Sequence, residues 1–168
     1  TTECAPVVSV NVPDFDAPGF HQLGTKHGTI GKPLPGVSVR TIDPDSGEPT
    51  PEGEPGLLLV KGPNIMQGYL KQEEKTAQVL VDGWYNTGDI AKIDEDGFII
   101  ITDRLARFSK IAGEMVPHTK IEETLHELLE LDEQTFAVTS VPDEQKGERL
   151  VVLHTLMDGE LELLVDKL

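Results

Sequence analysis

Residues 82–116 constrain the fold of this chain most, because they place a glycine turn, a hairpin signal and a cationic loop in direct succession. The motif Thr87-Gly88-Asp89 opens the series, and a glycine between Thr and Asp is typical of a tight turn whose two side chains project to one side. The carboxylate of such an Asp can accept two hydroxyl hydrogens at once. We therefore interpret the stretch as half of a nucleotide site followed by a hinge.

A hairpin is predicted directly after this motif. Residues 94–97, Asp-Glu-Asp-Gly, are a strong turn signal, and the apolar, β-branched run at residues 98–102 predicts a buried strand. Arg104 comes 15 positions after Asp89 (104 − 89 = 15). A two-strand return is therefore expected to bring this arginine close to the aspartate.

The residues before the motif predict a β-rich region. Residues 37–42 alternate between apolar and polar, and residues 56–61 form an apolar run, so both are expected to be strands of an antiparallel or barrel-like sheet. Residues 72–80 are rich in Lys, Glu and Ala and predict a short helix. Residues 11–26 carry Pro, Asp and Gly without a sustained period, so we expect a loop there.

A different pattern follows Gly113. Apolar residues recur at helical spacing over residues 121–129, which predicts an amphipathic helix. Residues 136–141 and 150–155 predict two strands joined by a turn, and residues 161–168 predict a further helix.

Together the two patterns predict an α+β fold with two domains. We expect a β-barrel-like subdomain in residues 1–102 and a small α+β domain in residues 103–168. A chain of 168 residues of which 38% are hydrophobic is long and apolar enough to bury a core.

The charge and the cysteine content narrow the functional classes. The chain has 14 basic and 30 acidic residues, a net charge of −16, which argues against a nucleic-acid-binding surface because phosphates would be repelled. Cys4 is the sole cysteine, so no disulfide can form within the chain, and a reducing cytoplasm fits best. The sequence has no secretory peptide and no apolar run of about 18 residues.

Two motifs in the central stretch resemble those of the adenylate-forming enzymes, which include acyl-CoA synthetases, acyl-[acyl carrier protein] synthetases, peptide-synthetase adenylation domains and luciferases. Residues 85–89 are similar to the Tyr-x-Thr-Gly-Asp motif of this family, and residues 103–113 are similar to its Gly-Arg-x-Lys-Asp-x-Ile-Lys-x-x-Gly loop. The segments RFSKIAGEMV and KGERLVVLHT resemble the synthetase half of bifunctional acyl-[acyl carrier protein] synthetase/2-acylglycerophosphoethanolamine acyltransferases. The resemblance extends from Thr1 to about Thr155.

The resemblance implies ATP or AMP and Mg²⁺ as cofactors and assigns residues to them. Asp89 would bind the two ribose hydroxyls, and Arg104 would reach the same ribose or its phosphate. Thr2 would contact the nucleotide phosphate, and Glu3 would help to hold Mg²⁺. Judged by residue type alone, two alternatives stay open: Asp89 and Arg104 are structural or pair with each other, and Glu3 is simply solvated.

The resemblance also implies that the second domain is a lid, which rotates about a hinge between two half-reactions. Lys110 would be the catalytic loop lysine near the adenylate during thioester formation, and Gly113 would leave room for a pantetheine arm. The alternatives are a solvated strand lysine and a bulge glycine. This sequence departs from the family at the hinge, where Ala106 replaces the usual Asp or Lys and Arg107 replaces the next acid.

Basic residues around this loop suggest a partner for the acidic chain. We expect them to form a strip that receives the acidic face of an acyl carrier protein. The strip consists of Arg104, Arg107, Lys110 and Lys120.

The sequence thus predicts a piece of a fatty acyl-adenylate-forming ligase. Such an ATP-dependent acid-thiol ligase transfers the acyl group of a fatty acid to acyl carrier protein. This transfer can be coupled to the acylation of a lysophospholipid. The alternatives are a piece of an acyl-CoA ligase and a non-catalytic module that docks carrier protein. The parent enzyme is expected in the cytoplasm or at the cytoplasmic face of the inner membrane. The chain has no initiator Met, phosphate loop or terminal catalytic lysine, so we do not expect it to form an adenylate by itself.

Overall fold

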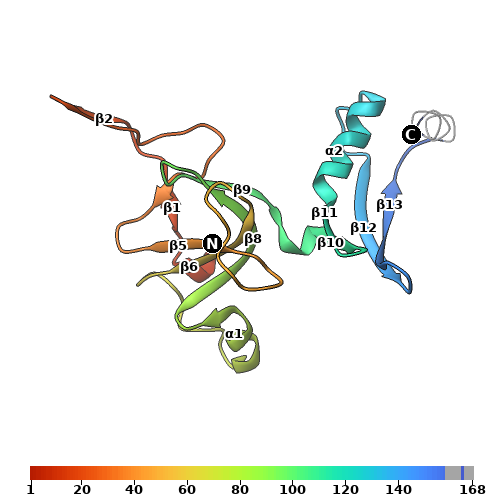
Figure 1. Cartoon of the computed structure of the whole chain (residues 1–168), viewed down its shortest axis with the longest axis horizontal. Coiled ribbons are helices and arrows are strands. Elements are labelled where there is room, and N and C mark those ends of the chain that lie inside the picture. The colour runs from red at the N-terminus through yellow and green to blue at the C-terminus, as the bar shows by residue number, and fades with distance from the viewer. Residues whose placement is uncertain (158–163, 165–168) are drawn as a thin grey trace. The chain divides into compact units, whose positions relative to one another are not determined.

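A computed structural model describes residues 1–157 and residue 164 (Figure 1). The helix predicted at residues 161–168 lies outside the described residues, apart from Leu164. The chain divides into two compact units, Thr1–Leu105 and Ala106–Leu168, and each is described by itself below. Most of the described structure is β, with helices in both units.

A curled, antiparallel five-stranded sheet organises the first unit, and its long strand β8 is the hub. Strand β8 (Trp84–Ile93) pairs along one edge with β6 (Gly56–Lys61), which pairs in turn with β5 (Ser38–Ile42). Along its other edge, β8 pairs with β7 (Leu80–Val81) near its start and with β9 (Ile99–Arg104) further on. The strands predicted at residues 37–42 and 56–61 are therefore confirmed, as is the turn at residues 94–97.

The core of the first unit lies on β6 and its neighbours. Five consecutive residues of β6, from Gly56 to Val60, are buried, so both faces of this strand are covered. Val60 and Leu58 pack with Tyr85, Ile99 and other buried residues. Cys4 belongs to the same cluster and is fully buried, so it acts as a small apolar side chain.

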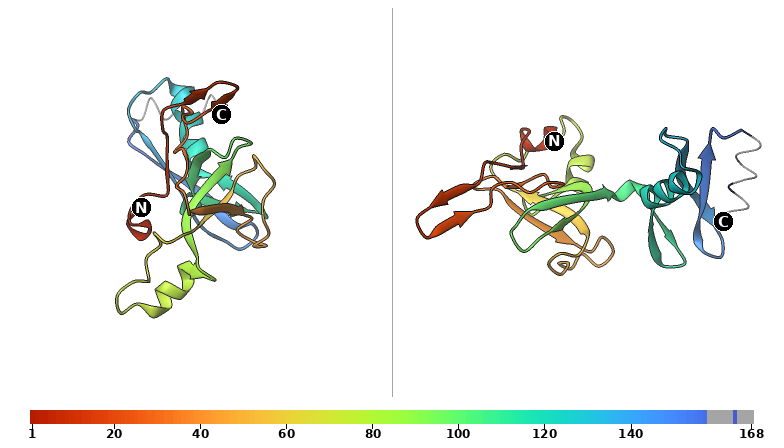
Figure 2. Two further views of the ribbon diagram at one scale, coloured as in Figure 1. Left: turned by 90° about the vertical axis from the view of Figure 1, so that its left-hand side faces the viewer. Right: turned by 90° about the horizontal axis from the view of Figure 1, so that it is seen from above.

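Shorter elements surround this sheet (Figure 2). A 3-10 helix (Thr2–Cys4) opens the chain, β1 (Ser9–Val10) pairs with β4 (Lys32–Pro33), and α1 spans Glu73–Val79 within the range predicted for a helix.

The prediction of a loop at residues 11–26 is wrong for the centre of this range. Strands β2 (Phe15–Ala17) and β3 (Phe20–Gln22) form a hairpin there, which projects from the unit in Figure 2. Gly19 in the connecting turn has a φ of 77°, a conformation that glycine adopts without strain. Pro18-Gly19 was the turn signal for this hairpin, but the flanking residues lack the apolar alternation of a half-buried strand.

Thr87-Gly88-Asp89 is a bulge within strand β8 and not the tight turn that the motif predicts. Leu57 pairs with Ile90 and Leu59 pairs with Asn86, so β8 uses two more residues than β6 across this interval. Gly88 has a φ of 73°, which accounts for the glycine in the motif. A bulge and a tight turn favour the same residue types, so the sequence motif is the same for both. The register of β8 with β6 shows that the motif forms a bulge here.

The second unit packs a helix against a four-stranded antiparallel sheet. Helix α2 (His118–Leu129) contains the amphipathic pattern, and the sheet has the order β11-β10-β13-β12. A 3-10 helix (Leu105–Arg107) leads into β10 (Phe108–Ile111), which forms a hairpin with β11 (Glu114–Pro117). Strands β12 (Phe136–Asp143) and β13 (Gly147–His154) form a second hairpin. The core is built from Leu125, Phe136 and Leu164.

Among the described residues, no helix combines the length and the apolar character needed to cross a bilayer.

Candidate functional site

Strands β8 and β9 bring Asp89 and Arg104 together, as the hairpin spacing predicted. The two residues are register partners, and Arg104 Nε lies 2.9 Å from Asp89 Oδ1. Arg104 Nη1 also donates to the backbone oxygen of Thr87 at 3.2 Å. The Asp89 side chain is 25% exposed and that of Arg104 63%. The pair is therefore accessible, and its contribution to stability is small because solvent screens it.

The bulge itself holds Asp89 in place. The Thr87 hydroxyl donates to the backbone oxygen of Leu58 at 3.0 Å and accepts the N–H of Asp89 at 3.0 Å. The N–H of Gly88 donates to Asn86 Oδ1 at 2.9 Å. These bonds fix the backbone from Asn86 to Asp89 before any ligand binds.

Asp89 lines a hollow of about 320 Å³ in the first unit. Most of the wall is apolar, with Val8, Leu58 and Ile101 among its residues, and Thr1 and Asp89 are among its polar members. A carboxylate at the wall of an apolar hollow suits a ligand that has both a flat apolar part and hydroxyl groups.

The predicted residues at the start of the chain, Thr2 and Glu3, are not among the wall residues of this hollow, but their neighbour Thr1 is. Thr1, a wall residue, donates its hydroxyl to Glu3 Oε2 at 2.6 Å, and the hydroxyl of Tyr69 donates to Glu3 Oε1 at 3.0 Å. Hydrogen bonds from Thr1 and Tyr69 and the backbone of Glu3 hold the pKa of the Glu3 carboxyl below its ordinary value. The Thr2 side chain is exposed, and its backbone oxygen accepts the N–H of Ala5.

The donor set around Glu3 is compatible with Mg²⁺, although it is sparse. The Glu3 carboxylate is charged at neutral pH, as a hard cation requires, and its lowered pKa extends that charge into more acidic solution. Among the residues that the structure describes, no group of three or more His, Cys, Asp or Glu side chains forms a metal cage. One carboxylate together with substrate phosphates is a common way for proteins to hold Mg²⁺, so Glu3 fits that role.

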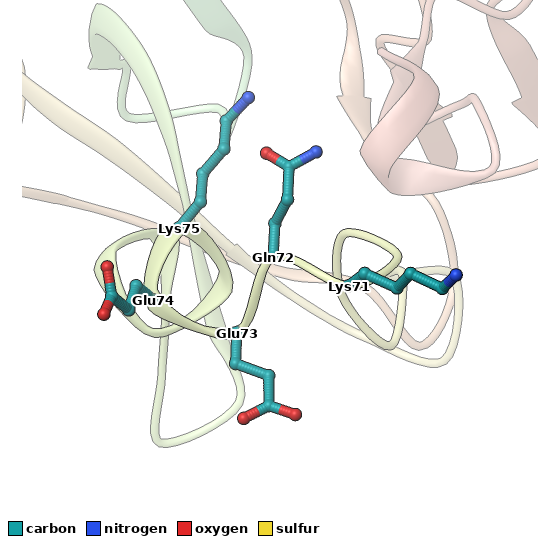
Figure 3. Close-up of a pocket in the computed structure, with 5 residues that line it drawn as sticks. All are labelled: Lys71, Gln72, Glu73, Glu74 and Lys75. Carbon is teal, nitrogen blue, oxygen red and sulfur yellow. The ribbon is translucent and has the colours of Figure 1, made fainter.

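A larger hollow, about 690 Å³, lies at the start of α1, away from the predicted site residues (Figure 3). Its lining consists of five consecutive residues, Lys71 to Lys75. Their side chains diverge in Figure 3, and they do not converge on a common point. Divergent charged side chains are typical of a solvated surface, so we assign no ligand to this hollow.

Lys110 and Gly113 belong to the hairpin β10–β11 of the second unit. Lys110 pairs with Met115, and its N–H donates to the carboxylate of Glu148 on β13. Ala112 and Gly113 form the turn, with φ values of 51° and 95°, and open space surrounds the position of a Gly113 Cβ. The turn geometry accounts for this glycine without a ligand.

The basic strip is less basic than the sequence suggests. Arg104 is paired with Asp89, and Arg107 Nη2 lies 2.5 Å from Glu122 Oε2 on α2. Glu122 is buried and also accepts the N–H of Val138 at 2.7 Å. Arg107 therefore neutralises a buried carboxylate within the second unit, and reversing its charge would disrupt that unit.

Sequence reasoning also missed several polar contacts. Ser109 Oγ and His118 Nε2 lie 2.5 Å apart in the interior of the second unit, and the sequence carries no local signal for this pair. Trp84, at the start of β8, is half-buried, and the guanidinium carbon of Arg40 lies 4.2 Å from the centroid of its ring. The contact between Tyr69 and Glu3 is equally invisible in the sequence, because it joins residues far apart in the chain.

Comparisons with known proteins agree with the motifs. The family model for AMP-binding enzymes matches residues 1–70. A long-chain-fatty-acid–CoA ligase from Salmonella typhimurium is 40% identical over 160 residues, which are 95% of this chain and 27% of the relative. A feruloyl-CoA synthase from an Amycolatopsis species is 39% identical over 137 residues, which are 79% of this chain and 27% of the relative. The chain thus spans about a quarter of the length of these relatives.

Solved structures show the same likeness. ATP-bound MatB from Rhodopseudomonas palustris matches with a TM-score of 0.64 and 33% identity over 84% of this chain and 29% of its own. The amide bond synthetase McbA from Marinactinospora thermotolerans matches with a TM-score of 0.60 and 36% identity over 83% of this chain and 29% of its own.

Proposed function

Because this chain belongs to the AMP-binding, adenylate-forming enzyme superfamily, we propose that it is part of a ligase that activates a fatty acid with ATP. In that reaction the carboxylate of the acid attacks the α-phosphate of ATP and expels pyrophosphate. A thiol then attacks the resulting mixed anhydride, which yields a thioester and AMP. The long-chain-fatty-acid–CoA ligases among the relatives support the fatty acid as substrate.

We propose coenzyme A as the thiol acceptor. Relatives that are 40% identical to this chain are named long-chain-fatty-acid–CoA ligases, and this supports CoA over a protein acceptor. Acyl carrier protein is the second candidate, with the likeness of residues 107–116 and 146–155 to acyl carrier protein synthetases in its favour. The weakened basic strip counts against a docking site built from Arg104 and Arg107. Coupling to lysophospholipid acylation and a location in the cytoplasm or at the inner membrane stay predictions.

One observation carries the proposal: Asp89 and Thr1 line the same hollow, and Thr1 is bonded to Glu3. We propose that Asp89 accepts the ribose hydroxyls of ATP. Its Oδ1 is bonded to Arg104, and a carboxylate has acceptor capacity to spare at Oδ2. Arg104 then has two tasks, because it orients Asp89 and offers its remaining donors to the ribose or phosphate.

The remaining site residues follow the family motifs. We propose that Thr2 contacts the nucleotide phosphate and that Glu3 supplies one carboxylate oxygen to Mg²⁺, which would neutralise phosphate charge. Lys110 is proposed to act near the adenylate during thioester formation. Gly113 is proposed to leave space for the pantetheine arm beside the β10–β11 turn, because glycine has no side chain and the position of its Cβ faces open space.

Pyrophosphate exchange by the complete enzyme tests the nucleotide role of Asp89. The variant Asp89→Asn is expected to raise the KM for ATP about tenfold to a hundredfold, because each lost charge-assisted bond costs about 1.5–3 kcal/mol. The matched control is Asp16→Asn on the β2–β3 hairpin, where the same change of charge occurs at an exposed position. Equal KM values for Asp89→Asn and the control would contradict the proposal.

A comparison of acceptors tests the thiol. The complete enzyme is incubated with ATP, a long-chain fatty acid and either CoA or acyl carrier protein, and thioester formation is measured. We expect the higher kcat/KM with CoA. A higher value with acyl carrier protein would favour the second candidate, and adenylate formation without any thioester would contradict both.

A further inference from the structure

The loop of residues 62–69 holds the start of the chain at four points. Asn64 Nδ2 donates to the backbone oxygens of Cys4 (3.1 Å) and Val7 (2.8 Å), and the N–H of Met66 donates to the backbone oxygen of Glu3 at 2.8 Å. The fourth contact is the 3.0 Å bond from the Tyr69 hydroxyl to Glu3 Oε1. Three of these contacts fix the backbone, and the contact from Tyr69 fixes the carboxylate.

Helix α1 holds Tyr69 in turn. The N–H of Tyr69 donates to the hydroxyl of Thr76 at 2.9 Å, and the ammonium of Lys75 lies 4.5 Å from the centre of the Tyr69 ring. Gly68 has a φ of 147°, and a Cβ at this position would lie 2.7 Å from the Thr76 methyl group. The loop can therefore approach α1 closely because residue 68 is a glycine. This close approach brings Thr76 and Lys75 onto Tyr69, and their contacts orient its ring.

We propose that Tyr69 is a positioning residue for the Glu3 carboxylate, which it holds in the orientation that meets a magnesium–nucleotide complex. This inference rests on the proposed function, in which Glu3 contributes to the Mg²⁺ site. The Tyr69 hydroxyl donates to Oε1 and the Thr1 hydroxyl donates to Oε2, so Tyr69 restricts rotation of the carboxylate together with Thr1. Each oxygen keeps a further lone pair for a metal. Tyr69 touches neither metal nor nucleotide in this assignment.

Thr1 is the other residue that acts on the Glu3 carboxyl, because its hydroxyl and its terminal ammonium both lower the pKa of Glu3, and Tyr69→Phe leaves both in place. Burial raises the pKa of the Cys4 thiol and of the Tyr85 phenol, so both stay neutral while Glu3 titrates. A hydrogen bond to Glu3 also raises the pKa of Tyr69, which keeps its hydroxyl proton available for donation at neutral pH.

The first experiment follows the Glu3 carboxylate directly. The chain is labelled with ¹³C at glutamate carboxyl carbons, Glu3→Gln identifies the resonance, and its titration is recorded in the parent chain and in Tyr69→Phe. This variant keeps the ring beneath Lys75 and removes the hydroxyl alone. We expect the midpoint of the Glu3 titration to move to higher pH, and an unchanged midpoint would overturn the proposal. Thr50→Val, which removes a hydroxyl bonded to Thr41 in the same unit, is the control and should leave the midpoint unchanged.

The second experiment separates this inference from the proposed function. Mn²⁺ is titrated into the complete enzyme with a non-hydrolysable ATP analogue, and broadening of the Glu3 resonance is measured. Tyr69→Phe should raise the Mn²⁺ concentration for half-maximal broadening about tenfold, the usual effect of losing an outer partner of a metal ligand. Unchanged affinity in Tyr69→Phe, with Glu3 broadened in the parent, would overturn the positioning role alone. Absence of Glu3 broadening in the parent enzyme would overturn the metal role of Glu3 and with it this inference.

Discussion

The binding role proposed for Asp89 and Arg104 uses side chains that already form an ion pair in the fold. Arg104 fixes the aspartate through Nε, and the bulge bonds fix its backbone, so the carboxylate is oriented before a nucleotide arrives. Binding then costs little conformational entropy at this position. The exposed pair contributes less than about 1 kcal/mol to stability, so its loss should affect nucleotide binding more than folding.

Glu148 is a second residue whose charge the fold uses. The pKa of the Glu148 carboxyl lies below the ordinary value of 4.5, mainly because the backbone N–H of Lys110 donates to it. A hydrogen bond from the Ser140 hydroxyl lowers this pKa further. A lowered pKa in the folded state means that the carboxylate stabilises the fold above about pH 4.5. This stabilisation is lost as the pH falls through the folded pKa.

We therefore predict that Glu148→Gln lowers the urea midpoint of the second unit at pH 7. The difference from the parent chain should shrink below the folded pKa, where the parent Glu148 is protonated too. Glu144→Gln, in the exposed turn nearby, is the control and should leave the urea midpoint unchanged both at pH 7 and at low pH. A difference that stays constant from pH 7 to pH 3 would show that the charge of Glu148 contributes nothing.

At the scale of elements, the segment around Gly31 crosses close to β1, and this crossing requires a glycine at position 31. A Cβ at Gly31 would lie 2.0 Å from the carbonyl carbon of Val10, and its φ is 87°. The same segment bonds to β9, because the N–H of Ile99 donates to the Gly31 oxygen at 3.0 Å. Gly28 has a similar φ of 78° but open space around its Cβ position.

This contrast gives a matched pair of variants. Gly28→Ala should cost about 1–2 kcal/mol of unfolding free energy, from backbone strain alone. Gly31→Ala should cost about 1–3 kcal/mol more, because the clash with backbone atoms adds to the strain. Urea unfolding of the two variants measures the difference, and equal destabilisation would contradict the packing described here.

The elements that could be predicted are those whose partners are close in sequence or whose apolar pattern is strong. Strands β5, β6 and β9 and helix α2 follow from their composition, and the hairpin spacing placed Arg104 beside Asp89. The hairpin of β2 and β3 escaped prediction because Phe15 and Phe20 are both exposed and no core dictates their pattern. The contact of Tyr69 with Glu3 could not be predicted, because it joins residues that are far apart in the sequence.

The whole molecule consists of two units with separate cores, one around Val60 and Tyr85 and the other around Leu125 and Phe136. In the first unit Thr1 and Asp89 line one hollow, and Thr1 is bonded to Glu3. The second unit contains Lys110 and Gly113. The ligase proposed above would use residues of both units in its two half-reactions.

We predict that each core supports its own unit. Phe136→Ala should cost about 3–5 kcal/mol and should remove amide-exchange protection from β12 and α2. Leu58→Ala, at a position 2% exposed in the first core, should cost about 2–5 kcal/mol and should act on β6 and β8. Loss of protection in all strands with either variant would contradict the division.

The central claim is that the Asp89 carboxylate accepts hydroxyls of a nucleotide ribose, and a thermodynamic cycle tests it most directly. The Kd values of ATP and 2′,3′-dideoxy-ATP are measured for the complete enzyme and for Asp89→Asn. We predict that the enzyme discriminates against the dideoxy nucleotide about tenfold or more and that Asp89→Asn loses most of this discrimination, because carboxylate and hydroxyls act on each other. Equal discrimination by both proteins would contradict the claim.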